Sequence, residues 1–332
     1  MDLTGRAAKR LAGLVERATA VVPVGARTHW EVGGPPAPAT EVRAPGGVVE
    51  HEPAELTITV GAGLTAAALA DVLAEAGQEC PLDPREPGAT VGGVLATGLS
   101  GPRRLRYGPL RDRVLEVRFV TARGRLVKGG GPTVKNVTGY DLPRLLVGSL
   151  GTIGVLVQVT LRCQARPRCA RWFAGVETPD AVGRRLFRPS SVLWDGATTR
   201  VLLEGDPEDV EAEARRAGLE PGGPAPWPDG PHRGRVSVPP SRLAALGTAL
   251  DDSEGISWLA EAGVGTVHVG AATVAALAEA RQRAEEQGGW LLREAGAAEL
   301  HPFGAVHDRA LQSRVRRAFD PDGKLSPGRV PW

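Results

Sequence analysis

Three glycine-rich segments in the first half of the chain constrain its fold more than any other feature. They are PVGARTHW at 23–30, ATVGGVLATGLSG at 89–101 and KNVTGYDLPRLLVGSLGTIGVL at 135–156. Glycine lets a backbone lie close against another surface because it carries no Cβ. Successive backbone N–H groups in such a loop can also surround a phosphate group. The three segments therefore predict a ligand site built largely of main chain.

A fourth segment, TVGAGLTAAALADVLAEAG at 59–77, has the strand–glycine–helix outline of a nicotinamide dinucleotide site. Such a site needs an acidic residue about 20 positions later, at the end of the next parallel strand. The sequence at that distance is CPLDPREPG, 80–88, and its three prolines exclude a central strand. We therefore assign Gly61 and Gly63 to packing and expect no nicotinamide cofactor.

The length of 332 residues exceeds what one hydrophobic core usually spans. A basic, proline-broken stretch, RCQARPRCARW, begins at residue 162 and indicates a boundary. Beyond it, strands near 170–176, 199–204, 234–238, 266–270 and 290–294 alternate with helices, and EPGGPAPWPDGP at 220–231 reads as a loop. No internal repeat is visible. The expected divisions are 1–165, a smaller α+β domain over 166–300, and a tail over 301–332.

Charge and cysteine content narrow the classes of function. Lys and Arg outnumber Asp and Glu by 40 to 38, so no strong field favours nucleic acid or an anionic membrane. The charged N-terminal segment and the absence of a long apolar run predict a cytoplasmic protein without a membrane span. Three cysteines without a CxxC pair predict no iron–sulfur cluster and no metal site, so redox chemistry would need an organic cofactor.

Several strings together resemble the FAD-binding domain of the vanillyl-alcohol-oxidase type, also called PCMH-type, and within it the FAD-binding subunits of bacterial glycolate oxidases. They are TVGG at 90–93, GLSGPRR at 98–104, RDRVLEVRFVTARG at 111–124, KNVTGYDL at 135–142, GSLGTIGVL at 148–156 and FDPDGKLSPGR at 319–329. The resemblance covers about 20–162 and 306–329. It implies an α+β fold with a two-subdomain FAD-binding unit and a second, smaller ferredoxin-like domain.

The resemblance also implies which residues bind FAD. Gly25, Ala26, Arg27 and Thr28 would hold the pyrophosphate. Thr90, Gly92, Gly93, Ala96, Gly98, Leu99, Ser100 and Gly101 would line the ribityl chain and flavin. Gly139, Tyr140, Gly148, Gly154 and Val155 would close over the adenosine half, and 325–328 would return to the flavin edge. Arg27 stands where relatives sometimes carry a flavin-bonded histidine, so the FAD is expected to be non-covalent.

The same resemblance implies oxidation of a small 2-hydroxy acid such as glycolate. Lys135 is the candidate for binding the substrate carboxylate, no catalytic base is evident, and His268 is interpreted as structural. Because the chain lacks cluster ligands, a separate iron–sulfur subunit and a second flavoprotein subunit are expected, which could hold it at the inner membrane face. The alternatives are a self-sufficient FAD-dependent dehydrogenase and a non-catalytic assembly subunit.

Overall fold

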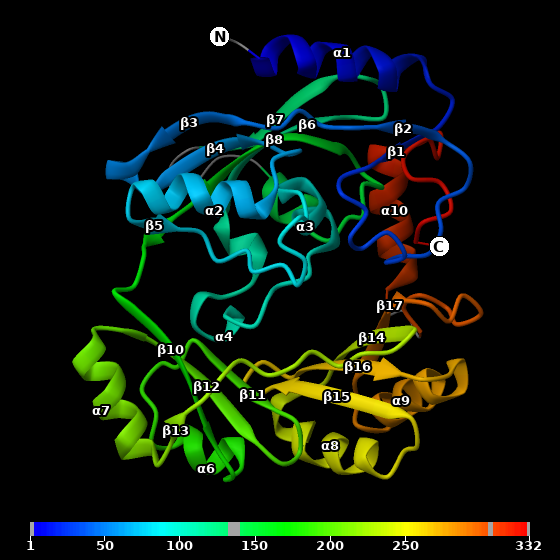
Figure 1. Cartoon of the computed structure of the whole chain (residues 1–332). Coiled ribbons are helices and arrows are strands. Elements are labelled where there is room, and N and C mark those ends of the chain that lie inside the picture. Colours follow the sequence, from blue (N-terminus) through cyan, green and yellow to red (C-terminus); the bar gives the residue numbers. More distant parts are fainter. Residues whose placement is uncertain (1–2, 132–139, 305–307, 331–332) are drawn as a thin grey trace.

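The computed structural model describes residues 3–131, 140–304 and 308–330. Two layered bodies lie one above the other, and the C-terminal segment returns to the first of them (Figure 1). The first body contains residues before about 165, and the second contains an eight-stranded sheet formed by residues 169–295. We propose a domain boundary at 166–168, where the chain passes from one body to the other.

The first domain is built on a five-stranded antiparallel sheet. Its order is β3 (Val48–Glu52), β4 (Thr57–Gly61), β8 (Val155–Arg162), β6 (Val114–Val120) and β7 (Leu126–Gly130). Strand β8 is buried on both faces because helices cover both. Helix α1 (Leu3–Arg17) packs Leu11 and Val15 on one face. Helices α2 (Ala66–Glu75) and α3 (Val91–Thr97) pack on the other.

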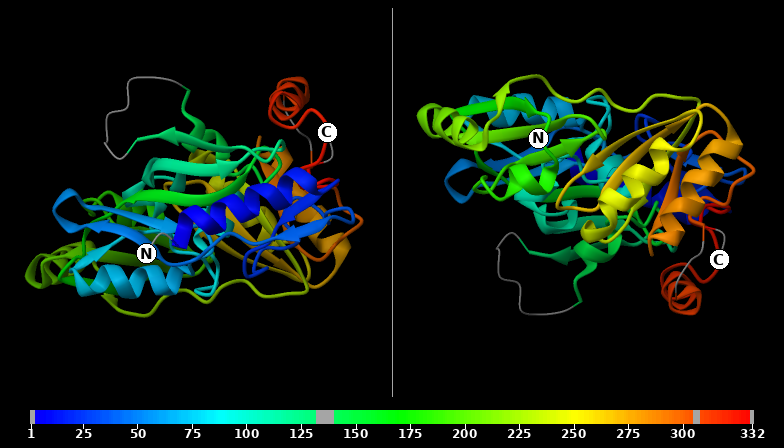
Figure 2. Two further views of the ribbon diagram at one scale, coloured as in Figure 1. Left: turned by 90° about the horizontal axis from the view of Figure 1, so that it is seen from above. Right: turned by 90° about the horizontal axis from the view of Figure 1, so that it is seen from below.

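A small lobe beside this sheet joins the start of the chain to its end. Strands β1 (Val21–Pro23) and β2 (Thr40–Val42) pair in parallel, and Leu325 from the tail bridges to Val21. The Asp320 carboxylate accepts the backbone N–H groups of Lys324 and Leu325, which fixes the turn after helix α10 (Arg309–Phe319). Helix α10 itself stands at the periphery of the molecule (Figure 2).

The second domain contains two consecutive β-α-β-β-α-β units, each with the strand order of a ferredoxin-like fold. The first comprises β10 (Cys169–Gly175), α6 (Pro179–Gly183), β11 (Ser191–Trp194), β12 (Thr199–Gly205), α7 (Pro207–Ala217) and β13 (Glu220–Pro221). The second comprises β14 (His232–Ser237), α8 (Leu243–Asp251), β15 (Ile256–Glu261), β16 (Thr266–Ala271), α9 (Val274–Glu286) and β17 (Trp290–Ala295).

Pairing of β11 with β15 joins the two units into one eight-stranded sheet. Helices α6 to α9 cover the face that points away from the first domain, so the other face is turned toward it (Figures 1 and 2). The sequence carries no visible repeat because the two units share a topology rather than a residue pattern. The predicted α+β fold class is confirmed.

Three local predictions were wrong or incomplete. The pattern missed β11 and β15, which form the seam of the long sheet. Glu220 and Pro221 fall in the predicted 220–231 loop, yet they pair with β10 as an edge strand. Residues 91–97 form a helix despite two adjacent glycines, because the Thr90 side chain caps its first turn. In the first two cases pairing with a neighbouring strand outweighs the weak local sequence pattern. In the third case the helix cap does so.

Short segments of the first domain contact the second through one buried acid. Helix α4 (Arg104–Tyr107) extends from the first domain toward the eight-stranded sheet (Figure 1). The Glu204 side chain on β12 accepts a 2.5 Å hydrogen bond from the Tyr107 hydroxyl and lies 3.1 Å from Arg103. Arg106 donates to the Glu204 carbonyl at 2.8 Å. This network fixes the face of the sheet against the first domain.

Candidate functional site

Three adjoining cavities follow the glycine-rich segments and end between the two domains. The inner cavity lies among β1, β2, α3 and residues 149–156, and the loop cavity is lined by 25–30, α3, Leu150, Gly151 and Arg329. These two share Pro23, Gly25, Thr90, Gly93, Ala96 and Gly151. The third, here called the charged pocket, shares His29 and Thr97 with the loop cavity. These adjoining cavities, here together called the slot, lead toward the second domain.

The loop after β1 presents a row of unpaired amides to the slot. Residues 25–29 all line the loop cavity, and within the described residues none of their backbone N–H groups donates a hydrogen bond. The Gly25 carbonyl is held by Arg43 at 2.7 Å, which fixes the loop from outside. Arg27 has φ +60° while Ala26 does not have a positive φ. Alternation of this kind makes consecutive N–H groups converge, and converging donors bind phosphate.

Arg27 occupies a conformation that favours glycine, and its side chain has a protein partner. The guanidinium pairs with Glu41 on β2 and lies over the Trp30 ring at 4.5 Å. Because an L-residue with positive φ is strained, these contacts offset part of the cost of the loop shape. A pyrophosphate would therefore have to compete with Glu41 for the Arg27 guanidinium. The backbone N–H of Arg27 remains available.

Helix α3 forms the opposite wall, and its two glycines have different reasons for lacking a side chain. A Cβ at Gly92 would lie 2.9 Å from the Ala62 carbonyl oxygen, so close backbone packing requires that glycine. A Cβ at Gly93 would meet only the Thr90 hydroxyl, at 3.0 Å, and Gly93 lines both the inner and the loop cavity. Gly93 thus leaves space in the slot rather than in the protein core.

Residues 148–154 form one side of the slot and contact the C-terminal tail. The backbone N–H of Gly148 donates to Leu95 at 2.9 Å and that of Leu150 to Ala96 at 2.8 Å, which docks this loop on α3. Ser326, fully buried in the tail, donates its hydroxyl to the Gly151 carbonyl at 3.2 Å. Helix α3, residues 148–154 and the C-terminal tail, which are far apart in sequence, therefore contact one another beside the slot.

The structure brings most of the predicted FAD residues to this slot. Those lining the inner or loop cavity are Gly25, Ala26, Arg27, Thr28, Thr90, Gly92, Gly93, Ala96, Gly154 and Val155. Leu99, Ser100 and Gly101 line the charged pocket. The predicted residues outside these three cavities are Gly98, which ends α3 with φ +67°, Gly148, and Tyr140, which is 90% exposed. Gly139 and Lys135 lie outside the described residues.

Gly148 instead lines another cavity, a groove of about 540 Å³ between residues 145–153 and α10. This groove is bordered mainly by apolar side chains, including Trp290, Leu311 and Val315. It lies on the other side of the 148–153 loop from the amide row of 25–29. Its size alone does not make it the cofactor site, because the Arg316 guanidinium in its lining already donates to the carbonyls of Arg329 and Val330.

Arg329 adds a buried positive charge to the loop cavity. Its guanidinium donates to the Trp30 carbonyl at 2.7 Å and to the Val32 carbonyl at 2.5 Å, and it lies 4.7 Å from the Trp30 ring. No carboxylate pairs with it among the described residues, and burial lowers its pKa to about 10. A buried cation without an acidic partner is costly unless an anion joins it. The free amides and Arg329 together fit the diphosphate and flavin of FAD.

Replacing Arg329 with methionine should weaken FAD binding about tenfold to a hundredfold, as expected from losing one charged hydrogen-bonding group. Fluorescence titration of the purified chain with FAD measures this change. Lys324→Met is the matched control, because Lys324 belongs to the same tail but donates to the Glu16 carbonyl outside the slot. Equal FAD affinity in Arg329→Met and the control would exclude Arg329 from the cofactor site.

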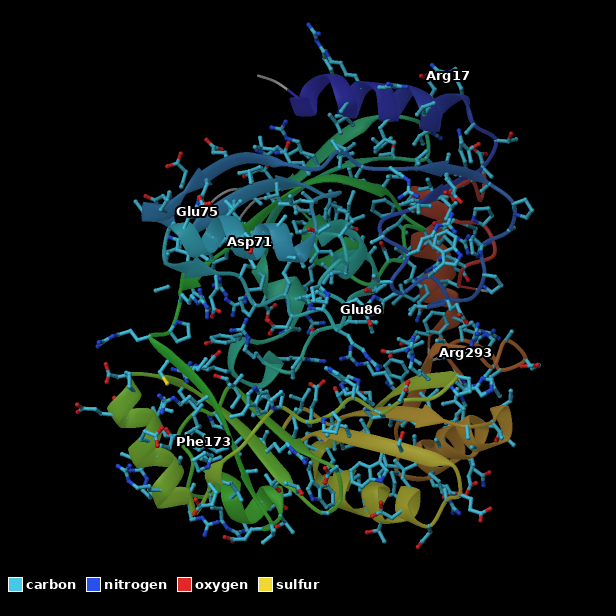
Figure 3. All side chains as sticks on the ribbon, viewed as in Figure 1. Arg17, Asp71, Glu75, Glu86, Phe173 and Arg293 are labelled. Atoms are coloured by element: carbon cyan, nitrogen blue, oxygen red, sulfur yellow. The ribbon has the colours of Figure 1, made fainter. Side chains whose placement is uncertain are left out.

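The charged pocket lies where the slot meets the eight-stranded sheet. Its lining from the first domain includes His29, Asp83 and Arg85, and from the second domain Trp227, Arg235, His268 and Glu294. Arg235 on β14 and His268 on β16 are directly paired across the strands. Figure 3 labels Glu86, in the first domain, and Arg293, on β17 of the second domain.

Arg103 and Arg85 differ in their availability to a ligand. The Arg103 guanidinium forms ion pairs with the carboxylates of Glu79, Asp83 and Glu204, which leaves it unavailable to a ligand. Arg85 faces the charged pocket, lies over the Trp227 ring at 5.4 Å and donates weakly to the Pro228 carbonyl. Burial lowers the pKa of Arg85, and the nearby Arg233 lowers it further. Arg85 and Arg235 are therefore the two arginines in the lining of the charged pocket that could face an anion.

His29 joins the loop cavity to the charged pocket. Its pKa is lowered mainly by burial, so the neutral imidazole is favoured at pH 7. No base in the second domain is recognisable from the sequence, and Arg235, Glu261, Trp227 and Glu294 belong to no recognisable motif. The register of β14, β15 and β16 brings Arg235, Glu261 and His268 together. Trp227 comes from the loop before β14, and Glu294 comes from β17. His268, interpreted from sequence as structural, lines the pocket with them.

Other redox or metal centres are not apparent in the part of the chain that the structure describes. No three His, Cys, Asp or Glu side chains there gather to hold a metal ion. The three cysteines are unpaired, and burial raises the pKa of Cys80 and of Cys163, which keeps those thiols protonated. None of the helices described has the length and apolar content needed to cross a membrane.

Relatives with named activities match part of the chain. Glycolate oxidase subunit GlcE of Escherichia coli (strain K12) is 43% identical over 132 residues, which cover 39% of this chain and 38% of the relative. The mitochondrial D-lactate dehydrogenase [cytochrome] of Arabidopsis thaliana is 41% identical over 114 residues, covering 34% of this chain and 20% of the relative. The matches thus span well under half the length of these relatives.

The similarity of fold extends over both domains. A solved structure of alkyldihydroxyacetonephosphate synthase superposes with a TM-score of 0.71 and 15% identity, covering 97% of this chain and 74% of that one. At this identity the likeness concerns the fold alone. The model of the family described as "FAD binding domain" matches residues 7–130, which contain helix α3 and the loop of residues 25–29 with its unpaired backbone amides. Residues 7–130 of this chain are therefore similar to the FAD binding domain family, and the cofactor that this match indicates is FAD.

Proposed function

We propose that the chain is the FAD-binding subunit of an oxidoreductase that oxidises a small 2-hydroxy acid. The observation that carries this proposal is that the loop cavity, which is suited to FAD, adjoins the charged pocket, with His29 and Thr97 lining both. An FAD-dependent oxidation requires the substrate carbon to lie against the flavin, with cations for its carboxylate nearby. Arg85 and Arg235 line the charged pocket and would supply those cations.

The names of the sequence relatives support the substrate class. A glycolate oxidase subunit and a D-lactate dehydrogenase both act on 2-hydroxy acids by name. We infer that this chain binds FAD non-covalently, because the His29 imidazole contacts the Thr28 hydroxyl and Arg27 occupies the third place of the loop. FAD, when bound, supplies the two-electron acceptor, and the protein supplies binding, orientation and charge.

We propose that electrons leave the flavin for a separate iron–sulfur protein. The three cysteines provide no cluster ligand set, and the relative with 43% identity is itself named as a subunit. A second flavoprotein subunit is part of the same proposal. We place the protein in the cytoplasm, where these partners would bring it to the inner membrane face.

One observation favours a second candidate function, a self-sufficient dehydrogenase. The charged pocket contains His268 and Arg235 from the second domain, so the chain carries groups for proton transfer and for carboxylate binding. A non-catalytic assembly subunit would need neither. The two catalytic candidates differ in whether isolated protein reduces its own flavin.

Anaerobic addition of glycolate or D-lactate to the FAD-loaded chain tests the proposal. The oxidised flavin bands should disappear with glycolate when the co-purified partners are present, because the complex is then complete. Bleaching by the chain alone would favour the self-sufficient enzyme. A flavin that no 2-hydroxy acid bleaches, in the chain or in its complex, would contradict the proposed activity.

A further inference from the structure

We propose that Glu261 and His268 form a proton-accepting pair in the charged pocket, with Arg235 beside them to hold the carboxylate of a two- or three-carbon 2-hydroxy acid. This inference rests on the proposed function for its substrate class. The geometry of the pair itself is independent of that function. It lies on the face of the eight-stranded sheet that is turned toward the first domain.

The Glu261 carboxylate orients the His268 ring through a contact with its Nε2 atom. Glu261 Oε1 lies 2.6 Å from His268 Nε2, and both side chains are almost fully buried. Glu261 on β15 and His268 on β16 are diagonal neighbours, since His268 pairs with Leu259. With Nε2 donating to the carboxylate, Nδ1 is the ring nitrogen that can accept a proton. It has no hydrogen-bond partner among the described residues, and His268 lines the pocket.

The Trp227 ring fixes the other side of the imidazole. It packs edge-on against His268 with 4.5 Å between ring centroids and an angle of 89°. A ring held by an aromatic contact and a carboxylate keeps one orientation, which is what a proton acceptor requires. The carboxylate also stabilises the positive imidazolium after proton uptake.

Arg235 supplies the cation. One of its terminal nitrogens donates to the Ser100 carbonyl at 2.6 Å and lies 3.5 Å from Glu261 Oε1. Its Nε is buried without a hydrogen-bond partner among the described residues, as is Glu261 Oε2. The guanidinium is therefore held in place while part of its donor capacity stays unused. A carboxylate is the anion that matches a planar guanidinium.

The size of the pocket limits the ligand. It encloses about 30 Å³ for the centres of water molecules, which corresponds to roughly two or three waters. This space suits a carboxylate and one hydroxyl-bearing carbon. The distal carboxylate of a longer hydroxy diacid would in addition have to pass Glu294 and Asp83, which line the same pocket. We therefore expect glycolate or lactate to be accepted and 2-hydroxyglutarate to be rejected.

In the oxidation, the O–H and C–H bonds at the hydroxyl-bearing carbon break and a carbonyl forms. The hydroxyl proton would pass to His268 Nδ1, and FAD, when bound, would supply the two-electron acceptor for the hydride. His268 is thus the catalytic residue, and Glu261 is a positioning residue that acts through it. His29 is the competing proton acceptor, because it lines the same pocket from the first domain.

Oxalate binding to the FAD-loaded chain, measured by calorimetry at pH 7–8 in buffers of different ionisation enthalpy, tests the pair without turnover. Oxalate places a second negative oxygen where the alkoxide would form. Wild-type protein should take up about one proton per oxalate, because an imidazole that faces this oxygen becomes charged. The titratable or charged groups around it are Glu261 on β15, Arg235 on β14, Glu294 on β17, and His29, Asp83 and Arg85 from the first domain.

His268→Asn should lose the proton uptake, whereas His29→Asn should keep it. Arg235→Lys should keep the uptake and raise the Kd for oxalate about tenfold to a hundredfold. Glu261→Gln should reduce the uptake, because the imidazolium loses its carboxylate. His51→Gln, at a histidine on β3 that contacts Gln78, is the control and should match wild type. Variants are compared at equal FAD content, and Glu261→Gln and Arg235→Lys carry the test if His268→Asn does not fold.

Proton uptake that persists in His268→Asn, or that disappears in His29→Asn, would overturn the assignment. Oxalate binding without proton uptake in wild type would do the same. The proton uptake measured in this way does not depend on whether the complex oxidises a hydroxy acid. Protein that shows the expected uptake but is bleached by no hydroxy acid would retain the proton-accepting pair and contradict the proposed function.

Discussion

Gly93→Val is expected to abolish FAD retention by a chain that remains folded. The valine side chain would project into the slot where the inner and loop cavities meet, whereas inside the protein its Cβ would contact only the Thr90 hydroxyl. Overpacking a well-fitted site costs about 1–3 kcal/mol, which is roughly a 5- to 150-fold loss of affinity. The FAD-to-protein ratio after gel filtration, together with circular dichroism, measures retention and folding separately.

Gly88→Val is the matched control, because Gly88 is exposed, has no positive φ, and a Cβ there meets nothing within 4 Å. Gly92 is unsuitable, since its Cβ would collide with the Ala62 backbone and disturb the fold as well. If Gly93→Val keeps wild-type FAD content, helix α3 does not form the wall of the cofactor site.

Glu204→Leu is expected to lower the free energy of unfolding by about 3 kcal/mol or more, the usual cost of removing one partner from a buried charged pair. The loss arises because Tyr107, Ser190 and Arg103 all direct donors at this carboxylate. Urea unfolding of the FAD-loaded chain, followed by tryptophan fluorescence, measures the change. The second domain carries most of the tryptophans, so its separation from the first is visible in the signal.

Glu254→Leu is the control for this experiment, since Glu254 is an exposed acid in the same domain. Its effect should stay within about 0.5 kcal/mol, as for most surface substitutions. A Glu204→Leu variant as stable as Glu254→Leu would mean that the interface is held by apolar contacts instead. The cluster of Val32, Leu150, Leu292 and Val330, which joins β17 to the tail, is the contact that would then carry it.

The cofactor slot was predictable from sequence because main chain and glycine form it. Glycine positions such as Gly25 and Gly93 are visible in any sequence, and their order along the chain carries the family resemblance. The amide row of residues 25–29 follows from the same loop. What the sequence could not provide was the reason for each glycine, since the close contact of Gly92 with Ala62 depends on how α3 packs.

The charged pocket was not predictable, because its residues meet only through sheet register. Arg235 and His268 are 33 positions apart, and pairing of β14 with β16 places them opposite each other. A shift of one residue would turn both side chains to the face covered by α8 and α9. Strand β15, which contributes Glu261, was missed entirely, so the carboxylate that defines the role of His268 had no place in the sequence-based prediction.

Calorimetric titration of the purified, flavin-free chain with FAD tests the central claim most directly. The claim is that the free amides of residues 25–29, the open face of α3 and buried Arg329 form one site for this cofactor. We expect saturable binding of a single FAD per chain, together with the absorption spectrum of a protein-bound flavin. A folded chain that takes up no FAD at saturating concentration would contradict the account.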